Sequence, residues 1–305
     1  MRWRPSRTTQ VEDRRGAGGG GLGGLRMGGL GGGGIPLPVG GGIGGIVIFV
    51  IIIVVMNMMG GSSLGGALGG LGGAPGGQGG PIASLDPADE DAQFINSVTV
   101  DVQAFWADRF QAAGKDYPET VTVLFSGGTQ TGCGAASSAT GPFYCPADQK
   151  IFLDTDFFAD LSSRFGAPGR FAQAYVIAHE YGHHVQNVLG IMDSMRSQQQ
   201  SDPSKANDLS IRLELQADCL AGTWAHSIWT TPDQSDVESI TEADVRDAIN
   251  AAEAVGDDRI QEQATGEIHQ DSWTHGSSEQ RAKWFNTGFK AGTTESCDTF
   301  AVATP

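Results

Sequence analysis

Residues 176–186 read Val-Ile-Ala-His-Glu-Tyr-Gly-His-His-Val-Gln, and the rest of the chain is best understood from this stretch. On a helix, His179 and His183 lie four residues apart, so both imidazoles project from one face and can hold one zinc ion. Glu180 can then reach a zinc-bound water without binding the metal, and can take its proton. This arrangement predicts hydrolysis of an amide bond.

The surroundings of the motif favour a metal site over an ordinary polar helix face. Residues 170–189 predict a buried helix that ends before Gly190. Its apolar stripe consists of Phe171, Ala174, Tyr175, Ala178, Val185, Val188 and Leu189. A surface coincidence would not place two histidines and a glutamate within such a helix. His184 points away from the ligand face, and we expect it to pack or to support a ligand.

A catalytic zinc needs a third protein ligand. Residues 204–229 are rich in helix formers, and Glu214 and Asp218 lie one helical turn apart within them. One of these acids can bind the metal while the other accepts a hydrogen bond from a ligand histidine. Glu-x-x-x-Asp alone is an ordinary acidic helix face, but it is informative one loop and one helix after His-Glu-x-x-His.

These motifs resemble a known family of enzymes. The pair of motifs is similar to the gluzincin pattern of zinc metallopeptidases, and His-Glu-Tyr-Gly-His-His-Val-Gln resembles the bacterial "putative neutral zinc metallopeptidase" family. The resemblance extends from about residue 86 onward and includes Gly-Pro-Phe-Tyr-Cys-Pro at 141–146 and Gly-Ser-Ser-Glu-Gln-Arg at 276–281. It implies a peptidase that acts on a peptide or protein, without indicating which one.

The resemblance also implies residue roles. One zinc ion per chain would be held by His179, His183 and Glu214. Asp218 would fix a ligand histidine, and Glu180 would act as the base. The alternative is a catalytically silent zincin-fold binding or scaffold protein of the cell envelope. Glu180 favours the enzyme, because a purely structural zinc site needs no base.

Peptide hydrolysis passes through an oxyanion, so a hydrogen-bond donor besides zinc is expected. The candidates are Tyr181, His226, His269, His275 and Arg281. Residues 274–281 resemble a late His…Arg element of membrane-associated gluzincins, in which a helix starts just after the histidine. Ser277 followed by Gln280 predicts such a capped start. We therefore expect His275 to be the donor.

The N-terminal part differs in composition from the rest. Of the 46 glycines, 30 lie between residues 16 and 80, which leaves residues 86–305 for one folded domain. Residues 1–42 are basic and then Gly-rich, and residues 60–85 predict a flexible linker.

Residues 43–59 are apolar except for Asn57 and the glycines, and they predict a transmembrane signal anchor. A buried strand fits poorly between glycine linkers, and a cleaved signal peptide lacks a nearby Ala-x-Ala site. Six arginines precede the span, so we expect a single-pass cell-membrane protein with its N-terminus in the cytoplasm and the peptidase domain outside.

Charge and cysteine content add two expectations. After the predicted anchor, 13 basic residues face 33 acidic ones, a net of about −20, which argues against nucleic acid as a partner. The oligomeric state is not indicated. All four cysteines lie in the predicted external domain, where disulfides are expected. Among three possible connectivities we expect Cys133–Cys145 and Cys219–Cys297, although Cys219 could also be a buried thiol.

The order of predicted elements indicates an α+β fold. We expect a helix over 86–110, a strand over 121–125, a hairpin of 143–145 with 150–154, and a short helix over 156–165 before the zinc helix. This predicts a zincin-like domain with a small antiparallel sheet and active-site helices, preceded by one transmembrane helix. The hairpin would either bind an extended substrate by strand addition or only cover the core.

Overall fold

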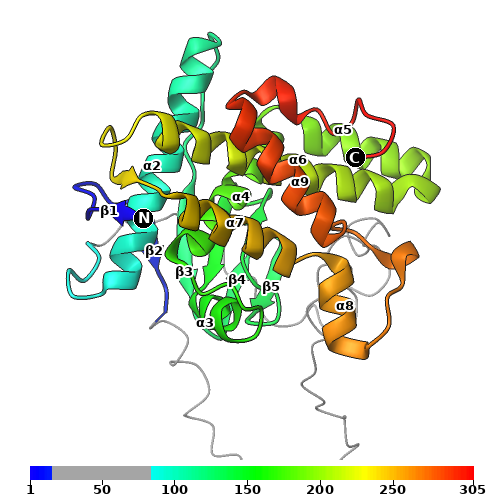
Figure 1. The fold of residues 1–305 in the computed structure, drawn as a ribbon, viewed down its shortest axis with the longest axis horizontal. Coiled ribbons are helices and arrows are strands. Elements are labelled where there is room, and N and C mark those ends of the chain that lie inside the picture. The colour runs from blue at the N-terminus through cyan, green and yellow to red at the C-terminus, as the bar shows by residue number, and fades with distance from the viewer. Residues whose placement is uncertain (16–83) are drawn as a thin grey trace, which may run out of the picture.

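The computed structural model describes residues 1–15 and 84–305 (Figure 1). Helices pack around a small sheet, and one short strand from the N-terminus joins it. The described strands are β1 Arg2–Trp3, β2 Val11–Asp13, β3 Val121–Phe125, β4 Gly128–Thr131, β5 Gly134–Ser137, β6 Phe143–Cys145, β7 Lys150–Asp154 and β8 Val237–Ser239. The described α-helices are α2 Glu90–Ala112, α3 Thr155–Ser163, α4 Arg170–Val188, α5 Ile191–Ser201, α6 Ala206–Thr230, α7 Glu242–Ala254, α8 Asp257–Thr265 and α9 Ser278–Ala291.

The central sheet has the strand order β2-β3-β7-β6 and is mixed. Strand β7 inserts between β3 and β6; it runs antiparallel to β6 and parallel to β3, and β2 adds a second parallel pair. The predicted strand bounds are confirmed, but the prediction of a purely antiparallel sheet is wrong. The reason is that β3 and β7 are not consecutive, so their pairing is not that of a hairpin. The tightly turned β6–β7 hairpin is antiparallel as expected.

The first 15 residues belong to the folded domain. Strand β1 pairs with β8, and β2 pairs with β3 (Figure 1). Val11 is fully buried in the main core, and the Arg15 guanidinium lies 2.6 Å from the carboxylate of Asp89, at the start of α2. Residues 1–15 and 84–305 therefore form one body.

This pairing corrects the predicted membrane topology. The proposed transmembrane segment, residues 43–59, lies outside the described residues. Among the residues that the structure does describe, no helix has the length and apolar character needed to cross a bilayer. A single crossing at 43–59 would also place residues 1–15 and 86–305 on opposite sides of the membrane, whereas β2 and β3 lie in one sheet. The predicted transmembrane helix before the domain is therefore not supported.

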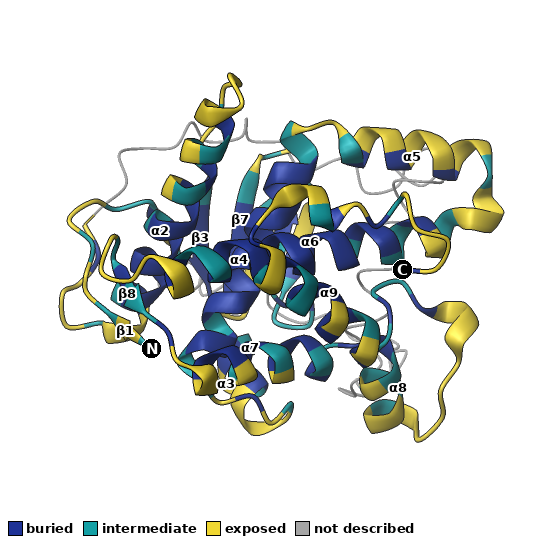
Figure 2. Cartoon of the chain, turned by 45° about the horizontal axis from the view of Figure 1, so that its top comes forward, coloured by how far each residue is buried: buried dark blue, intermediate teal, exposed yellow. Residues whose placement is uncertain are grey.

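Helix α4 runs through the centre of the molecule, and its residues are almost all buried (Figure 2). Helices α2, α6 and α7 pack against it, and α9 packs against α6 and α7. The backbones of α6 and α9 approach closely at two glycines. A Cβ atom on Gly222 would lie 2.1 Å from the carbonyl oxygen of Phe285, and one on Gly288 would lie 1.9 Å from that of Cys219. Glycine is therefore required at this crossing.

The predicted helices are confirmed, with shifted ends. The helix expected over 86–110 begins at Glu90, because Asp89 caps it by accepting from the backbone N–H of Ala92. The capping box predicted at Ser277 and Gln280 is present at the start of α9. Both expected disulfides, Cys133–Cys145 and Cys219–Cys297, are formed. The first joins the turn between β4 and β5 to β6, and the second joins α6 to the C-terminal tail.

Candidate metal centre

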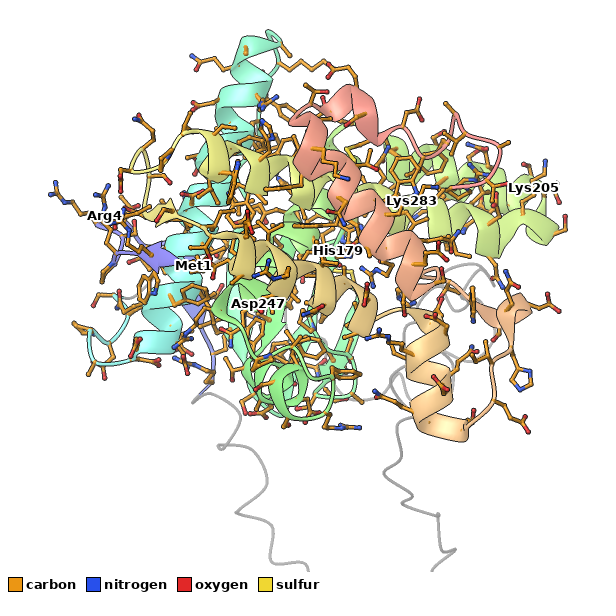
Figure 3. All side chains as sticks on the ribbon, viewed as in Figure 1. Met1, Arg4, His179, Lys205, Asp247 and Lys283 are labelled. Atoms are coloured by element: carbon orange, nitrogen blue, oxygen red, sulfur yellow. A yellow bond between two sulfur atoms is a disulfide. The ribbon has the colours of Figure 1, made fainter. Side chains whose placement is uncertain are left out.

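Three side chains from α4 and α6 converge on one point. His179 and His183 project from α4 and Glu214 from α6, and one donor atom from each lies within 4.8 Å of the others. Figure 3 shows His179 near the centre of the molecule. The two helices approach closely because α4 carries Gly182, whose Cβ position lies only 3.0 Å from the Cα of Ala217 on α6. The structure thus brings together the three residues that the sequence motifs single out.

The carboxylate of Glu214 lies between the two imidazoles. Its oxygens are 3.2 Å from Nε2 of His179 and 3.5 Å from Nε2 of His183. Burial alone would raise the pKa of Glu214, but the neighbouring histidines hold it well below its usual range. Burial alone would lower the pKa of His179, yet Asp218 and Glu214 raise it to about 9. The carboxylate and the two imidazoles thus attract one another at the point where a cation would bind.

A network of buried charges fixes His179. Its Nδ1 lies 2.9 Å from Oδ1 of Asp218, which also accepts from the Tyr175 hydroxyl at 2.5 Å. The guanidinium of Arg281 donates to both oxygens of Asp218, at 2.8 and 2.9 Å. Burial raises the pKa of Asp218, but Arg281 and His179 outweigh burial and lower it, so Asp218 is ionised. Asp218 therefore holds His179 with Nε2 facing Glu214.

A neutral amide fixes His183. Its Nδ1 lies 2.8 Å from Oε1 of Gln186, and the Gln186 amide donates in turn to Leu213 O and to Gln216 Oε1. The sequence analysis gave Gln186 no role. Its only local signal was a polar residue three positions after His183. The role of Gln186 becomes clear only in the folded protein, where α6 supplies the two acceptors for its amide.

Glu180 lies in the same cavity with one oxygen unused. It is 6% exposed, and its Oε2 has no hydrogen-bond partner among the described residues. Burial raises its pKa, against the opposing effect of His183 and His179. The cavity has a volume of about 890 Å³ and is lined by all three converging residues, by Glu180 and by His275. Glu180 is thus available to bind a proton at this site.

The structure distinguishes between the five candidate oxyanion donors. Only two of them, His275 and Arg281, line the cavity, and Arg281 is engaged with Asp218. Tyr181 lies in the core beside Thr122, His226 bonds to the carbonyl of Phe289, and the side chain of His269 is 68% exposed. His275 is therefore the best-placed donor.

A buried aspartate that the sequence analysis missed holds His275. Oδ1 of Asp257 lies 3.1 Å from Nδ1 of His275. Its Oδ2 accepts from the backbone N–H groups of Thr274, His275 and Gly276. Burial alone would lower the pKa of His275, but Asp257 and Glu214 raise it. Asp257 begins α8, about 20 positions before the helix that the motif marked, so no local pattern connected it to His275.

His184 has different contacts from those of His183. Its Nε2 lies 2.7 Å from the carbonyl of Pro118, and its Nδ1 lies 3.1 Å from the hydroxyl of Tyr144 on β6. Burial lowers its pKa, so the ring is neutral, donating to Pro118 and accepting from Tyr144. His184 connects the central helix to the edge strand, in agreement with its expected place off the ligand face.

The donor set fits a zinc ion on chemical grounds. Two imidazoles and one carboxylate are a known catalytic combination for zinc, and they leave a position open. Both ligand histidines already present Nε2, because their Nδ1 atoms are held by Asp218 and Gln186. Oε2 of Glu180 is a buried acceptor to which no group in residues 1–15 or 84–305 donates. A metal-bound water would satisfy that atom.

Comparison with known proteins agrees with this chemistry. The family described as "Putative neutral zinc metallopeptidase" matches residues 1–300. The uncharacterized protein YpfJ of Escherichia coli K12 is 42% identical over 303 residues, which cover 98% of this chain and 99% of that protein. The uncharacterized protein Rv2575 of Mycobacterium tuberculosis H37Rv is 50% identical over 185 residues, which cover 59% of this chain and 62% of that protein. No solved structure matches the chain. The family match spans nearly the whole chain and includes the residues that meet between α4 and α6, so the chain belongs to this zinc metallopeptidase family.

Proposed function

We propose that the protein is a zinc-dependent endopeptidase that cleaves peptide or protein substrates, with one zinc per chain held by His179, His183 and Glu214. The observation that carries this proposal is Glu180. Its carboxylate is buried beside the metal-binding residues, with an unpaired oxygen and a raised pKa. A structural metal site would gain nothing from an unpaired buried carboxylate, which is costly to keep.

Each residue of the site has a distinct part in this reaction. Zinc held by His179, His183 and Glu214 would supply a water of lowered pKa and would polarise the substrate carbonyl. Glu180 would take a proton from the attacking water and deliver it to the leaving amine. His275, held by Asp257, donates a hydrogen bond to the oxyanion. Its raised pKa keeps this ring in the donating, protonated form over a wider pH range.

Substrate binding is proposed at strand β6. The order β2-β3-β7-β6 leaves β6 at an edge of the sheet, and Phe143 and Tyr144 line the same cavity as the metal site. An extended peptide can add to such an edge through backbone hydrogen bonds. Tyr144 is held by His184, and Cys145 by its disulfide, so the edge is fixed before substrate arrives. This favours strand addition over a purely structural hairpin.

We also propose that the domain works in an oxidising, extracytoplasmic compartment. The support for this is the pairing of all four cysteines in disulfides, which persist in such compartments. The acidic excess of the chain speaks against nucleic acid as a partner. If free thiols are alkylated in cells and both disulfides are then found intact, the location is supported. Quantitative recovery of reduced thiols would contradict it.

The test of the activity compares the wild type with Glu180→Gln in the full chain. We expect one zinc per chain in both proteins by inductively coupled plasma mass spectrometry. Cleavage of a quenched, unstructured peptide library should fall by roughly 10²- to 10⁴-fold in the variant, the usual contribution of a general base. Glu262→Gln, an exposed change on α8, serves as the control and should leave cleavage intact. Zinc in both proteins with cleavage in neither would favour the silent scaffold.

A further inference from the structure

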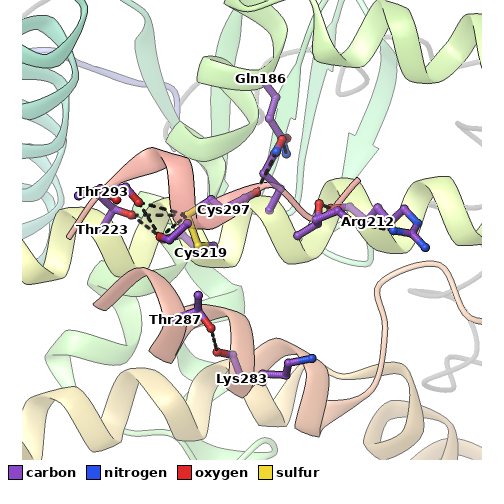
Figure 4. The surroundings of a disulfide bond; sticks show 11 residues. Gln186, Arg212, Cys219, Thr223, Lys283, Thr287, Thr293 and Cys297 are labelled. Atoms are coloured by element: carbon purple, nitrogen blue, oxygen red, sulfur yellow. Dashed lines mark hydrogen bonds between the residues drawn. A yellow bond between two sulfur atoms is a disulfide. The ribbon is translucent and has the colours of Figure 1, made fainter. Parts of the chain in front are cut away.

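We propose that Gln216 is a positioning residue: through Gln186 it connects the Cys219–Cys297 disulfide to the metal ligand His183 and so raises the affinity for zinc. The inference rests on the proposed function, because it concerns the same metal site. Figure 4 shows the disulfide with Arg212 of α6 and Gln186 of α4. Gln216 lies outside the sequence motifs, and Gln186 ends the stretch 176–186 but has no role in the predicted zinc site.

The first step is the orientation of Gln186. Its Nε2 donates to the carbonyl of Leu213 at 2.7 Å and to Oε1 of Gln216 at 3.1 Å. Both partners accept there, so the amide oxygen must face His183, whose Nδ1 lies 2.8 Å away. The proton of His183 is therefore on Nδ1, and the lone pair of Nε2 is free for a metal.

The second step is the orientation of Gln216. Its Nε2 donates to the carbonyl oxygen of Cys297 at 3.0 Å, and a carbonyl can only accept. The oxygen of Gln216 is thereby presented to Gln186. Gln186, Gln216 and Cys297 are all buried, so a reversed amide would find no water to satisfy it. The hydrogen bonds run in one direction, from His183 through Gln186 and Gln216 to Cys297. We call this series of hydrogen bonds the relay.

The third step is what fixes Cys297. Its disulfide joins it to Cys219, which lies on α6 three residues after Gln216. Arg212, two residues before Glu214 on α6, holds the tail that follows Cys297. The Arg212 guanidinium donates to the carbonyls of Thr299, Val302 and Ala303 at 2.6, 2.8 and 3.1 Å. The acceptor that ends the relay is thus held in place on α6.

The relay acts on one ligand only. His179 is held by Asp218, which is fixed by Arg281 and Tyr175 and needs nothing from the tail. Loss of the relay should therefore weaken zinc binding without abolishing it. Removal of a hydrogen-bond partner of a ligand costs about 10- to 100-fold in metal affinity, and for Gln216, one bond further out, we expect about 10-fold.

The experiment measures the zinc dissociation constant of the oxidised full chain by competition with a chromogenic chelator. Gln216→Met removes the relay at nearly constant volume. Gln103→Met, which removes the buried amide that accepts from the backbone N–H of Thr120, is the matched control. A second pair compares Cys219→Ser/Cys297→Ser with Cys133→Ser/Cys145→Ser. Long-range ¹H–¹⁵N spectra of the zinc-loaded protein follow the Nδ1 proton of His183.

The proposal predicts weaker zinc binding in Gln216→Met and in the Cys219/Cys297 variant, and wild-type affinity in both controls. Combining the two changes should add little to either, and the Nδ1 proton of His183 should exchange faster in both. Wild-type affinity in Gln216→Met would overturn the proposal, as would an equal loss in Gln103→Met. Absence of zinc from the wild type would instead overturn the proposed function, and this inference with it.

Discussion

Asp218→Asn is the substitution whose effect follows most directly from the structure. Asp218 has no exposed surface, and its two oxygens accept from His179, Tyr175 and Arg281. An asparagine at this position keeps one acceptor, its amide oxygen, which would face His179 and Tyr175. Its NH₂ group would then face the Nε–H of Arg281, so that two donors oppose each other. The charge of Arg281, itself 4% exposed, would lose its partner.

Breaking a buried ion pair by removing one partner costs about 3–5 kcal/mol. We therefore expect Asp218→Asn to lower the free energy of unfolding of the metal-free protein by about 4 kcal/mol. Zinc affinity should fall by about 10- to 100-fold as well, because His179 would lose its anionic acceptor. The double variant Asp218→Asn/Arg281→Met removes both charges. It should recover most of the stability, since uncharged replacements of buried pairs are often neutral, but not the affinity.

Urea denaturation with a chelator present, followed by tryptophan fluorescence, measures the stability. With a slope of about 3 kcal/mol per molar urea, a loss of 4 kcal/mol moves the midpoint by more than 1 M. Chelator competition measures the zinc affinity separately. The reasoning would be refuted by a single variant whose midpoint equals that of the wild type. It would equally be refuted if the double variant regained its zinc affinity together with its stability.

Three further predictions concern other parts of the molecule. Asp257→Asn should lower the pKa of His275, since Asp257 helps to raise it; the alkaline limb of the kcat/KM profile should then move to lower pH, and an unchanged limb would exclude His275 as the protonated donor. Gly288→Ala should destabilise the protein by at least about 1–3 kcal/mol, because the new Cβ would lie 1.9 Å from the carbonyl of Cys219; a wild-type Tm would contradict the close crossing. Chelation of zinc should lower the free energy of unfolding by about 2.7 kcal/mol relative to protein with free zinc at 100 times its Kd, and a Tm independent of zinc would contradict a site formed only in the folded state.

The features that sequence predicted well depend on short-range geometry. The spacing of His179 and His183 fixes a shared helix face regardless of what surrounds the helix. Glu214 and Asp218 obey the same spacing on α6, and the structure places Glu214 against both imidazoles and Asp218 behind His179. The hairpin of β6 and β7 was equally visible, since alternation and a turn define it locally.

The features that sequence missed depend on contacts between distant segments. Strand β2 reads Val-Glu-Asp, which has no strand signal, and it forms because the edge of β3 is available. The apolar composition of residues 43–59 was interpreted without the knowledge that residues 1–15 return to the domain. Asp257 and Gln186 acquire their roles only when α8 and α6 bring them partners. Local patterns carry no information about such partners.

Helix α6 shows that some of these long-range contacts were signalled in the sequence by the spacing of its polar residues. Four of its buried polar and cysteine residues fall on one stripe at intervals of four, three and four: Arg212, Gln216, Cys219 and Thr223. Every one of them contacts the C-terminal tail, Thr223 through the sulfur of Cys297. The metal-facing pair, Glu214 and Asp218, forms a separate stripe. Buried polar groups at helical spacing must find partners, so the first stripe predicts a covering segment even where it does not identify it. Helix α6 therefore carries the contacts to the tail on one face and the two metal-facing acids on another.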